Sequence, residues 1–379
     1  MKNHFFLVGL AVLMLSSCNN KPADQSTLSG LNPKNFQSTV NGVQTHLYTL
    51  KNKAGMEVCI TNFGGRIVSI MVPDKNGKMQ DVVLGFDSIK NYINIPSDFG
   101  ASIGRYANRI DHGKFVLDGK TIQLPINNFG HCLHGGPRGW QYQVYDAKPI
   151  DDTTLQLTRI SPDGDMNFPG KVTATVTFKL MEDNAIDIKY AATTDKKTVI
   201  NMTNHSYFNL NGNPEDLSTN NLLYLNADYY TPVDSTFMTT GEILPVKGTP
   251  MDFTTPKAVG KDITKTDFIQ IKNANGYDHN FVLNTKGDIK QVAARLTSPD
   301  TGITLEVYTT EPGIQVYTGN FLDGTVKGKK GIVYNQRASV CLETQHYPDS
   351  PNEPKWPSTV LSPGQTYHSE CIFKFSVNK

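Results

Sequence analysis

A strict two-residue alternation constrains the fold of this chain more than any other sequence feature. In KVTATVTFKL (171–180), Val172, Ala174, Val176 and Phe178 alternate with threonines and a lysine. A period of two puts the apolar side chains on one face of an extended segment, which predicts a half-buried β-strand. The turn-like residues EDNA follow, and IDIKY (186–190) then alternates again. The two segments are therefore expected to form a β-hairpin.

The same arrangement recurs later in the chain, where QVAARLTS, the turn PDTG and ITLEVYTT follow one another over residues 291–310. Helical periodicity is scarce, and one of its few short candidates is DSIKNYI, with Asp87 as a possible N-cap. No repeat of about 20–50 residues is visible, and no Pro/Ser/Gly-rich linker divides the chain after residue 40. These patterns predict an all-β fold, a large antiparallel β-sandwich with few short helices, formed by residues 38–379 as one domain.

Charge and motifs exclude several classes of function. The chain has 36 Lys and Arg against 35 Asp and Glu and shows no long basic or acidic run, which argues against the clustered positive charge of a nucleic-acid-binding protein. We find no GxGxxG between a strand and a helix, no phosphate-binding loop, no HExxH and no serine nucleophile elbow. The sequence therefore predicts neither an organic cofactor nor a metal, and no nucleic-acid partner.

The first residues resemble an export signal. Lys2 precedes an apolar run from Phe5 to Leu15, which is too short to span a bilayer comfortably and is typical of a signal peptide. LSSC (15–18) resembles a bacterial lipobox, in which Cys18 is lipidated and becomes the mature N-terminus; the alternative is an ordinary cleaved signal. We predict a signal peptide at 1–18 and a flexible tether at 19–37. The protein is then expected at the cell envelope, in the periplasm or on the outer membrane, with a lipid anchor as its only membrane contact.

The other four cysteines give no pairing signal. Cys59, Cys132, Cys341 and Cys371 are widely spaced and form no CxxC motif. An exported protein can contain disulfides, but the spacing favours no pair. We therefore predict none.

Polar residues gather on strand-like segments in a way that is unusual for a dry core. In NMTNHSYF the alternation puts Asn201, Thr203, His205 and Tyr207 on one face, and in ASVCLETQ it puts Glu343 on the same face as Ser339 and Cys341. Charged side chains are seldom buried without partners, so such faces pair with each other or line a wet cleft. Amides, carboxylates and aromatic rings together are typical of a sugar-binding site.

From about Val40 onward these clusters resemble the aldose 1-epimerase (galactose mutarotase) family. The motifs that carry the resemblance occur in the family's order: TNFGGRIVSIMVPDKNGKMQDVVLGFDSIKNY, GRYANRI, LHGG, NHSYFNL, YDHNF, EPGIQVYTGNFLDG and CLETQHYPDSPNEPKWPSTVLSPGQTY. The resemblance implies a large antiparallel β-sandwich, which agrees with the alternation. It also implies interconversion of the α- and β-anomers of free aldoses, such as galactose and glucose, without metal or organic cofactor.

The resemblance also assigns roles to residues. It implies that Glu343 is the base that takes the proton of the C1 hydroxyl and that His205 is the acid that protonates the ring oxygen from the other side of the O5–C1–O1 unit. Substrate-binding residues are implied in four motifs. Asn108, Arg109 and His134 are expected at the reacting end of the sugar, Asp278 on ring hydroxyls, and Gln315 on the substrate or behind Glu343. Tyr207, Phe208 and Phe281 are candidates for aromatic contact with the sugar, and the sequence does not rank them.

Three other functions remain open at this stage. A glycoside hydrolase needs two flanking carboxylates, for which Glu343 and Asp278 are the candidates. A hexose-6-phosphate 1-epimerase needs clustered cations, which Arg105 and Arg109 alone support weakly. A non-catalytic sugar-binding lipoprotein needs no facing acid and base, so the presence of both His205 and Glu343 argues against it. The expected partner is a small-molecule aldose substrate, and we expect a monomer.

Overall fold

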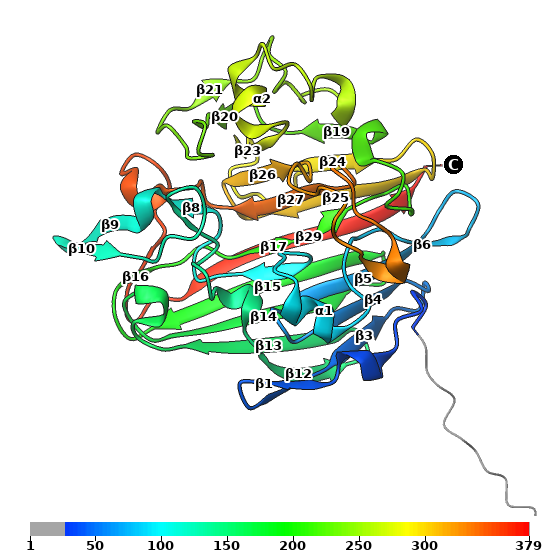
Figure 1. The fold of residues 1–379 in the computed structure, drawn as a ribbon, viewed down its shortest axis with the longest axis horizontal. Coiled ribbons are helices and arrows are strands. Elements are labelled where there is room, and N and C mark those ends of the chain that lie inside the picture. The colour runs from blue at the N-terminus through cyan, green and yellow to red at the C-terminus, as the bar shows by residue number, and fades with distance from the viewer. Residues whose placement is uncertain (1–26, 379) are drawn as a thin grey trace, which may run out of the picture.

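The computed structural model describes residues 27–378, and its regular structure is predominantly antiparallel β-strand with few short helices, which confirms the predicted fold class (Figure 1). The largest sheet has nine strands. In order across the sheet these are β12 (Asp146–Asp151), β13 (Thr154–Ser161), β14 (Val172–Leu180), β15 (Ala185–Thr194), β29 (Tyr367–Val377), β25 (Ile303–Thr309), β24 (Ala294–Thr297), β19 (Leu222–Leu225) and β22 (Lys257–Ala258).

Two further sheets pack with it. A six-stranded sheet has the order β18 (Tyr207–Phe208), β27 (Val340–Gln345), β26 (Gly313–Tyr317), β23 (Asp278–Val282), β20 (Tyr229–Thr231) and β21 (Leu244–Pro245). A four-stranded sheet has the order β3 (Leu47–Lys51), β4 (Glu57–Thr61), β5 (Arg66–Pro73) and β6 (Met79–Asp81). One continuous apolar cluster contains side chains of all three sheets, among them Val58, Val176 and Leu342.

The remaining strands form short antiparallel pairs. These are β1 (Ser38–Val40) with β2 (Val43–Thr45), β7 (Ala101–Ile103) with β17 (Thr203–His205), β8 (Arg109–Ile110) with β11 (Cys132–Leu133), β9 (Lys114–Leu117) with β10 (Lys120–Gln123), and β16 (Thr198–Val199) with β28 (Val360–Leu361). The two α-helices of the described chain are short, α1 (Ile89–Asn94) and α2 (Ile269–Ala274). Helix α1 lies in the predicted place, but Ser88 rather than Asp87 caps it, because the Ser88 side chain accepts the amide hydrogen of Asn91.

The predicted hairpin is confirmed. Strands β14 and β15 pair in antiparallel register from Val172 opposite Thr194 to Leu180 opposite Ile186. Along β14 the side chains of Val172, Ala174, Val176, Phe178 and Leu180 are buried, while those between them are more exposed. The second predicted hairpin is β24 with β25. Strand β29 lies between β15 and β25 and so joins the two hairpins into one sheet.

The predicted tether differs from the structure over residues 27–37. Pro33–Phe36 form a 3₁₀ helix, and Leu31 and Phe36 are buried in a second apolar cluster with Cys59 and Phe63. The amide of Leu28 donates a hydrogen bond of 2.7 Å to Oε1 of Glu57. Burial of these two apolar side chains offsets the entropy lost in ordering the segment. Residues 19–26, the predicted signal peptide at 1–18 and Cys18 lie outside the described residues.

Two further observations concern membranes and thiols. Within residues 27–378 no helix is long and apolar enough to cross a membrane. Cys59, Cys132, Cys341 and Cys371 are buried free thiols.

Candidate active site

One face of the six-stranded sheet carries a row of polar and aromatic side chains. In its register Asp278 lies opposite Tyr317, Tyr317 opposite Cys341, and Cys341 opposite Tyr207. Glu343 stands two residues beyond Cys341 on β27 and is paired with Gln315. Residues directly opposite each other, or two apart on one strand, share a face. The sheet therefore presents Asp278, Tyr317, Tyr207 and Glu343 on the same side.

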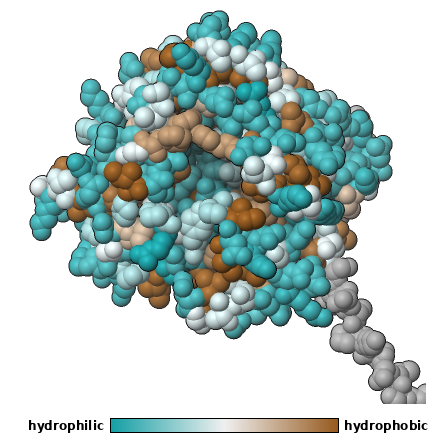
Figure 2. Space-filling model, in the orientation of Figure 1, coloured by the Kyte–Doolittle hydropathy of each residue, from teal (hydrophilic) through white to brown (hydrophobic). Residues whose placement is uncertain are grey.

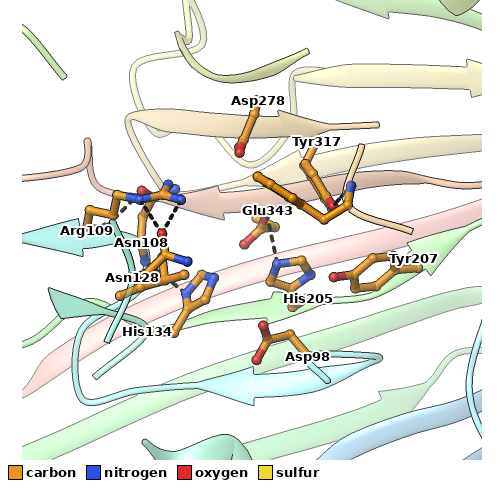
Figure 3. A pocket seen from close by; sticks show the side chains of 12 residues that line it. Asp98, Asn108, Arg109, Asn128, His134, His205, Tyr207, Asp278, Tyr317 and Glu343 are labelled. Carbon is orange, nitrogen blue, oxygen red and sulfur yellow. Dashed lines mark hydrogen bonds and ion pairs between the residues drawn. The ribbon is translucent and has the colours of Figure 1, made fainter. Parts of the chain in front are cut away.

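His205 reaches this face from the short strand β17. The pairing of β17 with β7 puts His205 opposite Ala101, and the amide of Gly100 donates to the carbonyl of His205 at 3.0 Å. The imidazole stacks on the ring of Tyr207, with ring centroids 4.9 Å apart and an interplanar angle of 19°. Its Nε2 is 3.5 Å from Oε1 of Glu343, and the side chains of both residues are almost fully buried (Figure 3). A hydrogen-bonding strand pair thus sets a histidine against a buried carboxylate.

These residues surround a cavity of about 230 Å³, which is small for a ligand site and suits a small molecule. Figure 2 shows a hollow near the middle of this face, with pale brown surface arching over one edge. Three phenylalanines form an aromatic cluster beside the cavity, and the centroids of Phe129 and Phe237 are 5.1 Å apart and those of Phe237 and Phe321 5.3 Å apart. Phe321 lines the cavity and is half exposed. A sugar ring can stack on aromatic surface of this kind through its C–H faces.

The strand pair β8 and β11 supplies the other wall. The amide of His134 donates to the carbonyl of Asn108 at 3.0 Å, and the amide of Asn108 donates to Nδ1 of His134 at 3.1 Å. Nη2 of Arg109 donates to Oδ1 of Asn128 at 2.9 Å, and its guanidinium lies 5.2 Å from the ring centroid of Phe237. These contacts hold the side chains of Asn108, Arg109 and His134 at the cavity.

The hydrogen bond to Nδ1 decides the proton position on His134. A neutral imidazole that accepts at Nδ1 carries its proton at Nε2, so Nε2–H is a donor. Burial lowers the pKa of His134 to about 3, so the ring is neutral at physiological pH. His134 is therefore a fixed, uncharged hydrogen-bond donor, suited to an oxygen of a sugar.

Two groups of side chains place potential metal-ligand atoms within 4.8 Å of one another: Asp98, His134 and His205; and Asp111, His112 and His131. The first group does not fit a metal, because one nitrogen of His134 accepts a backbone hydrogen and the other carries its own. In the second, the ring nitrogens of His131 contact the amide of His112 and the hydroxyl of Thr236. Neither donor set offers three free ligands.

Burial and neighbouring charges set the acidity of the carboxyl groups. Burial raises the pKa of Glu343 well above its usual range, Asp278 and Asp98 raise it further, and Arg109 opposes them. Burial also raises the pKa of Asp278, while Arg109 and the hydrogen bond from Gln315 lower it. Arg109 is thus the cation that favours the ionised form of both carboxyl groups.

His205 and Glu343 form a coupled pair. Burial lowers the pKa of His205, and Asp98 raises it. Burial alone favours the neutral pair, in which the proton lies on Glu343, while the 3.5 Å separation favours the ion pair. One proton can therefore lie either on Nε2 of His205 or on Oε1 of Glu343, the two atoms that are in contact. Such a pair can take a proton from one oxygen of a bound molecule and give one to another.

The structure brings most of the predicted site residues together. Glu343, His205, Asn108, Arg109, His134 and Asp278 all line the cavity. Gln315 does not line it. Its Nε2 donates to Oδ1 of Asp278 at 2.7 Å, so it orients Asp278 rather than Glu343.

The structure distinguishes the three aromatic candidates. Tyr207 lines the cavity, but Phe208 and Phe281 are fully buried in the main apolar cluster. Phe208 directly follows Tyr207, and Phe281 stands three residues after Asp278. Because successive side chains of a strand alternate between its two faces, both phenylalanines point to the side of the sheet opposite the polar face. Five lining residues were not predicted: Asp98, Asn128, Leu133, Tyr317 and Phe321. Register alone could have suggested Tyr317, which stands two residues after Gln315 on the same strand.

The described chain resembles known proteins along most of its length. The sequence profile of the family described as aldose 1-epimerase matches residues 46–374. The galactose mutarotase of Homo sapiens is 42% identical over 322 residues, which cover 85% of this chain and 92% of that protein. The aldose 1-epimerase of Escherichia coli (strain K12) is 39% identical over 337 residues, covering 88% and 96% of the two chains.

Solved structures agree with this result. A GalM/aldose epimerase homologue from C. elegans superimposes with a TM-score of 0.80 at 31% identity, covering 88% of this chain and all of that one. The galactose 1-epimerase from Lactobacillus acidophilus NCFM superimposes with a TM-score of 0.79 at 29% identity, covering 90% and 97%.

Proposed function

This chain belongs to the aldose 1-epimerase family, and we propose that it interconverts the α- and β-anomers of free aldohexoses with Glu343 as base and His205 as acid. The observation that carries the assignment of roles is the 3.5 Å contact between Nε2 of His205 and Oε1 of Glu343 in the wall of the cavity. An acid and a base this close can exchange two protons with neighbouring oxygens of one molecule.

The reaction begins with a cyclic sugar, a carboxylate at Glu343 and an imidazolium at His205. Glu343 takes the proton of the C1 hydroxyl while His205 gives its proton to the ring oxygen. The C1–O5 bond breaks, C1 becomes an aldehyde carbon, and the two protons balance. Rotation about C1–C2 exposes the other face of the aldehyde, and the same two groups, with roles reversed, close the ring.

The surrounding residues hold the sugar and its developing charge. Arg109 and the neutral donor His134 line the cavity beside Asn108 and are placed to stabilise negative charge on O1 or O5. Asp278, oriented by Gln315, accepts hydrogen bonds from ring hydroxyls. Tyr207, stacked on His205, fixes the plane of the imidazole. No metal or organic cofactor takes part in this scheme.

The cavity gives less support to a phosphorylated sugar. Arg109 is the one arginine or lysine among its lining residues in the described chain. Arg105 is used elsewhere, because its guanidinium donates to the carbonyls of Pro169 and Gly170 and to Oγ of Ser161. A phosphate group usually requires several convergent donors. Free aldoses therefore fit this cavity better than hexose 6-phosphates.

Polarimetry tests the activity. Freshly dissolved α-galactose or α-glucose is mixed with protein comprising residues 19–379, and the approach to anomeric equilibrium is compared with the spontaneous rate. We expect acceleration by the wild-type protein and loss of acceleration in Glu343→Ala and in His205→Ala. No acceleration by the wild type would exclude the activity, and full activity in either variant would exclude the proposed roles.

We further propose that residues 1–18 direct export and that Cys18 carries a lipid anchor at the cell envelope. The support is the short apolar run followed by LSSC. Palmitate labelling of the full chain, present in the wild type and lost in Cys18→Ser, is the expected result; labelling that persists in the variant contradicts it. Analytical ultracentrifugation of the protein without residues 1–18 tests the expected monomer.

A further inference from the structure

The segment just before β7 holds a carboxylate that the proposed mechanism does not use. Asp98 lies in the loop between α1 and β7 and lines the cavity. Its neighbours on both sides are fixed by Arg66, a fully buried arginine of β5. Nη1 of Arg66 donates to the carbonyl of Phe99 at 2.9 Å, and Nη2 donates to the carbonyls of Ser97 at 2.9 Å and Gln141 at 2.8 Å. Hydrogen bonds from the Arg66 guanidinium thus hold the backbone on each side of Asp98.

A close backbone approach fixes the same loop from its other end. Gly100 has a φ of +67°, and a Cβ at this position would lie 1.9 Å from the carbonyl oxygen of Ile67. The amide of Gly100 donates to the carbonyl of His205, which couples the loop directly to the strand of the proposed acid. These contacts leave Asp98 little freedom to move away from the cavity.

The Asp98 side chain points at the two histidines. One carboxylate oxygen of Asp98 and one ring nitrogen each of His134 and His205 lie within 4.8 Å of one another. Figure 3 shows Asp98 on the side of the His205 ring away from Glu343. Oδ1 of Asp98 is buried and makes no hydrogen bond to the described protein. The residue as a whole is partly exposed, but a buried carboxylate oxygen without a partner is costly unless a nearby positive charge compensates it.

We propose that Asp98 is a positioning residue that acts through His205, and that its carboxylate stabilises the imidazolium form from which His205 donates its proton to the ring oxygen. This inference rests on the proposed function, because it assigns Asp98 a part in the same proton transfer. Arg109 favours the ionised form of Glu343, and Asp98 favours the protonated form of His205. The two flanking charges therefore favour the ion pair that the reaction needs over the neutral pair that burial favours.

The other groups facing His205 do not supply this charge. Tyr207 stacks on its ring, and His134 and Tyr317 approach with centroid distances of 5.2 and 6.3 Å. His134 is neutral, since burial lowers its pKa to about 3, and burial raises the pKa of both tyrosines. Arg66 on β5 lowers the pKa of His205, while Asp98 raises it. Apart from Glu343, the reaction's own base, Asp98 is the negative charge that acts on His205.

The pH dependence of catalysis measures this effect. The alkaline limb of kcat/KM reports loss of the imidazolium, so removal of the Asp98 charge moves that limb to lower pH. An opposite charge at about 4–6 Å changes the pKa of a partner by roughly 1–3, so we expect the limb to move by about one pH unit or more in Asp98→Asn. Asp98 also raises the pKa of Glu343, so the acid limb moves in the same direction, but less, because Asp98 lies beyond His205.

The experiment compares Asp98→Asn with three other variants. Asp98→Glu keeps the charge and is expected to restore the alkaline limb toward its wild-type position. Asp98→Ser is a second neutral variant, made so that a folding defect of one substitution does not decide the result. Ser97→Ala changes the same loop without changing charge and is expected to leave the profile unaltered. Kinetics are measured with α-galactose and corrected for the spontaneous rate at each pH.

A proton NMR titration of the His205 ring, assigned with His205→Gln, measures the same effect without turnover. Its pKa is expected to fall by about one in both neutral variants and to stay near the wild-type value in Asp98→Glu. Unchanged pH limbs with a raised KM would show that Asp98 binds a sugar hydroxyl instead, and unchanged limbs and titration would show that it has no role in catalysis. Either result overturns the proposal. If the wild type has no epimerase activity, the proposed function fails, while the titration still decides whether Asp98 acts on His205.

Discussion

Replacement of Glu343 by glutamine tests whether the pair of His205 and Glu343 works as one unit. The amide keeps the size of the side chain, which is 2% exposed, but it can neither take a proton nor carry a charge. At the observed 3.5 Å, a full charge on each partner corresponds to an attraction of about 5 kcal/mol at an effective dielectric constant of about 20. A single general base or acid typically contributes about 10²–10⁴-fold, or about 3–5 kcal/mol of barrier. We therefore expect kcat/KM of Glu343→Gln to fall by about 10²–10⁴-fold.

The double variant makes the test sharper. If the two groups act independently, Glu343→Gln combined with His205→Gln loses the product of the two single effects. If they act as one proton-exchanging unit, the second substitution adds little, because the first has already disabled the exchange. We expect the double variant to lie within about tenfold of the worse single variant.

Initial rates are measured by polarimetry with α-galactose, and circular dichroism verifies that each variant is folded. Glu57→Gln is the matched control, since Glu57 is also fully buried but lies on β4 outside the cavity. A Glu343→Gln variant that retains more than about a tenth of wild-type kcat/KM would refute the role of Glu343 as base. Losses that multiply in the double variant would refute the coupling.

Three further predictions concern the residues around the pair. Gln315→Leu removes the hydrogen bond to Asp278, and loss of this bond raises the pKa of the Asp278 carboxyl further. We expect KM for galactose to rise about tenfold with little change in kcat. An unchanged KM would contradict the orienting role of Gln315. Phe321→Ala should raise KM several-fold without changing Tm, because the ring is half exposed at the cavity. Phe281→Ala should instead cost about 3–5 kcal/mol of stability in urea unfolding with kcat preserved, because this ring is fully buried. The reverse pattern would show that we have assigned the two rings to the wrong sides of the sheet. Gly135→Ala should lower kcat at least tenfold. Gly135 has a φ of +78°, and a new Cβ would lie 2.4 Å from the carbonyl oxygen of Gly104, which forces the adjacent His134 to move. Wild-type kcat in this variant would show that the loop tolerates the shift.

The fold could be predicted from the sequence where a periodic pattern covered a whole strand. The alternation in β14 and β15 determines both the hairpin and its buried face, because a half-buried strand needs one apolar side. The start of the ordered chain could not be predicted in this way. Leu31 and Phe36 stand as single apolar residues among polar ones, and only the tertiary structure shows the apolar cluster that buries them.

The residues of the site, too, could be predicted from the sequence only in part. Resemblance located the residues within family motifs, and the structure brings Glu343, His205 and their companions to one cavity. Composition could not decide which aromatic rings face that cavity, because Phe208 and Phe281 differ from Tyr207 only in the side of the sheet to which they point. Asp98 lies in an irregular loop, where no period predicts the direction of a side chain. Its place beside His205 follows from strand pairing between β7 and β17, segments that are about a hundred residues apart in sequence.

The central position of β29 has a consequence for how the protein is made. This strand, residues 367–377, lies between β15 and β25 and hydrogen-bonds to both. Until it has been synthesised, the two halves of the nine-stranded sheet each expose an unpaired edge, and the core between them stays open. Completion of this sheet therefore waits until residues 367–377 have been synthesised, and long-range pairing of this kind is slow. Deletion of residues 367–377 would therefore leave two unpaired strand edges in place of one sheet, and such edges favour aggregation.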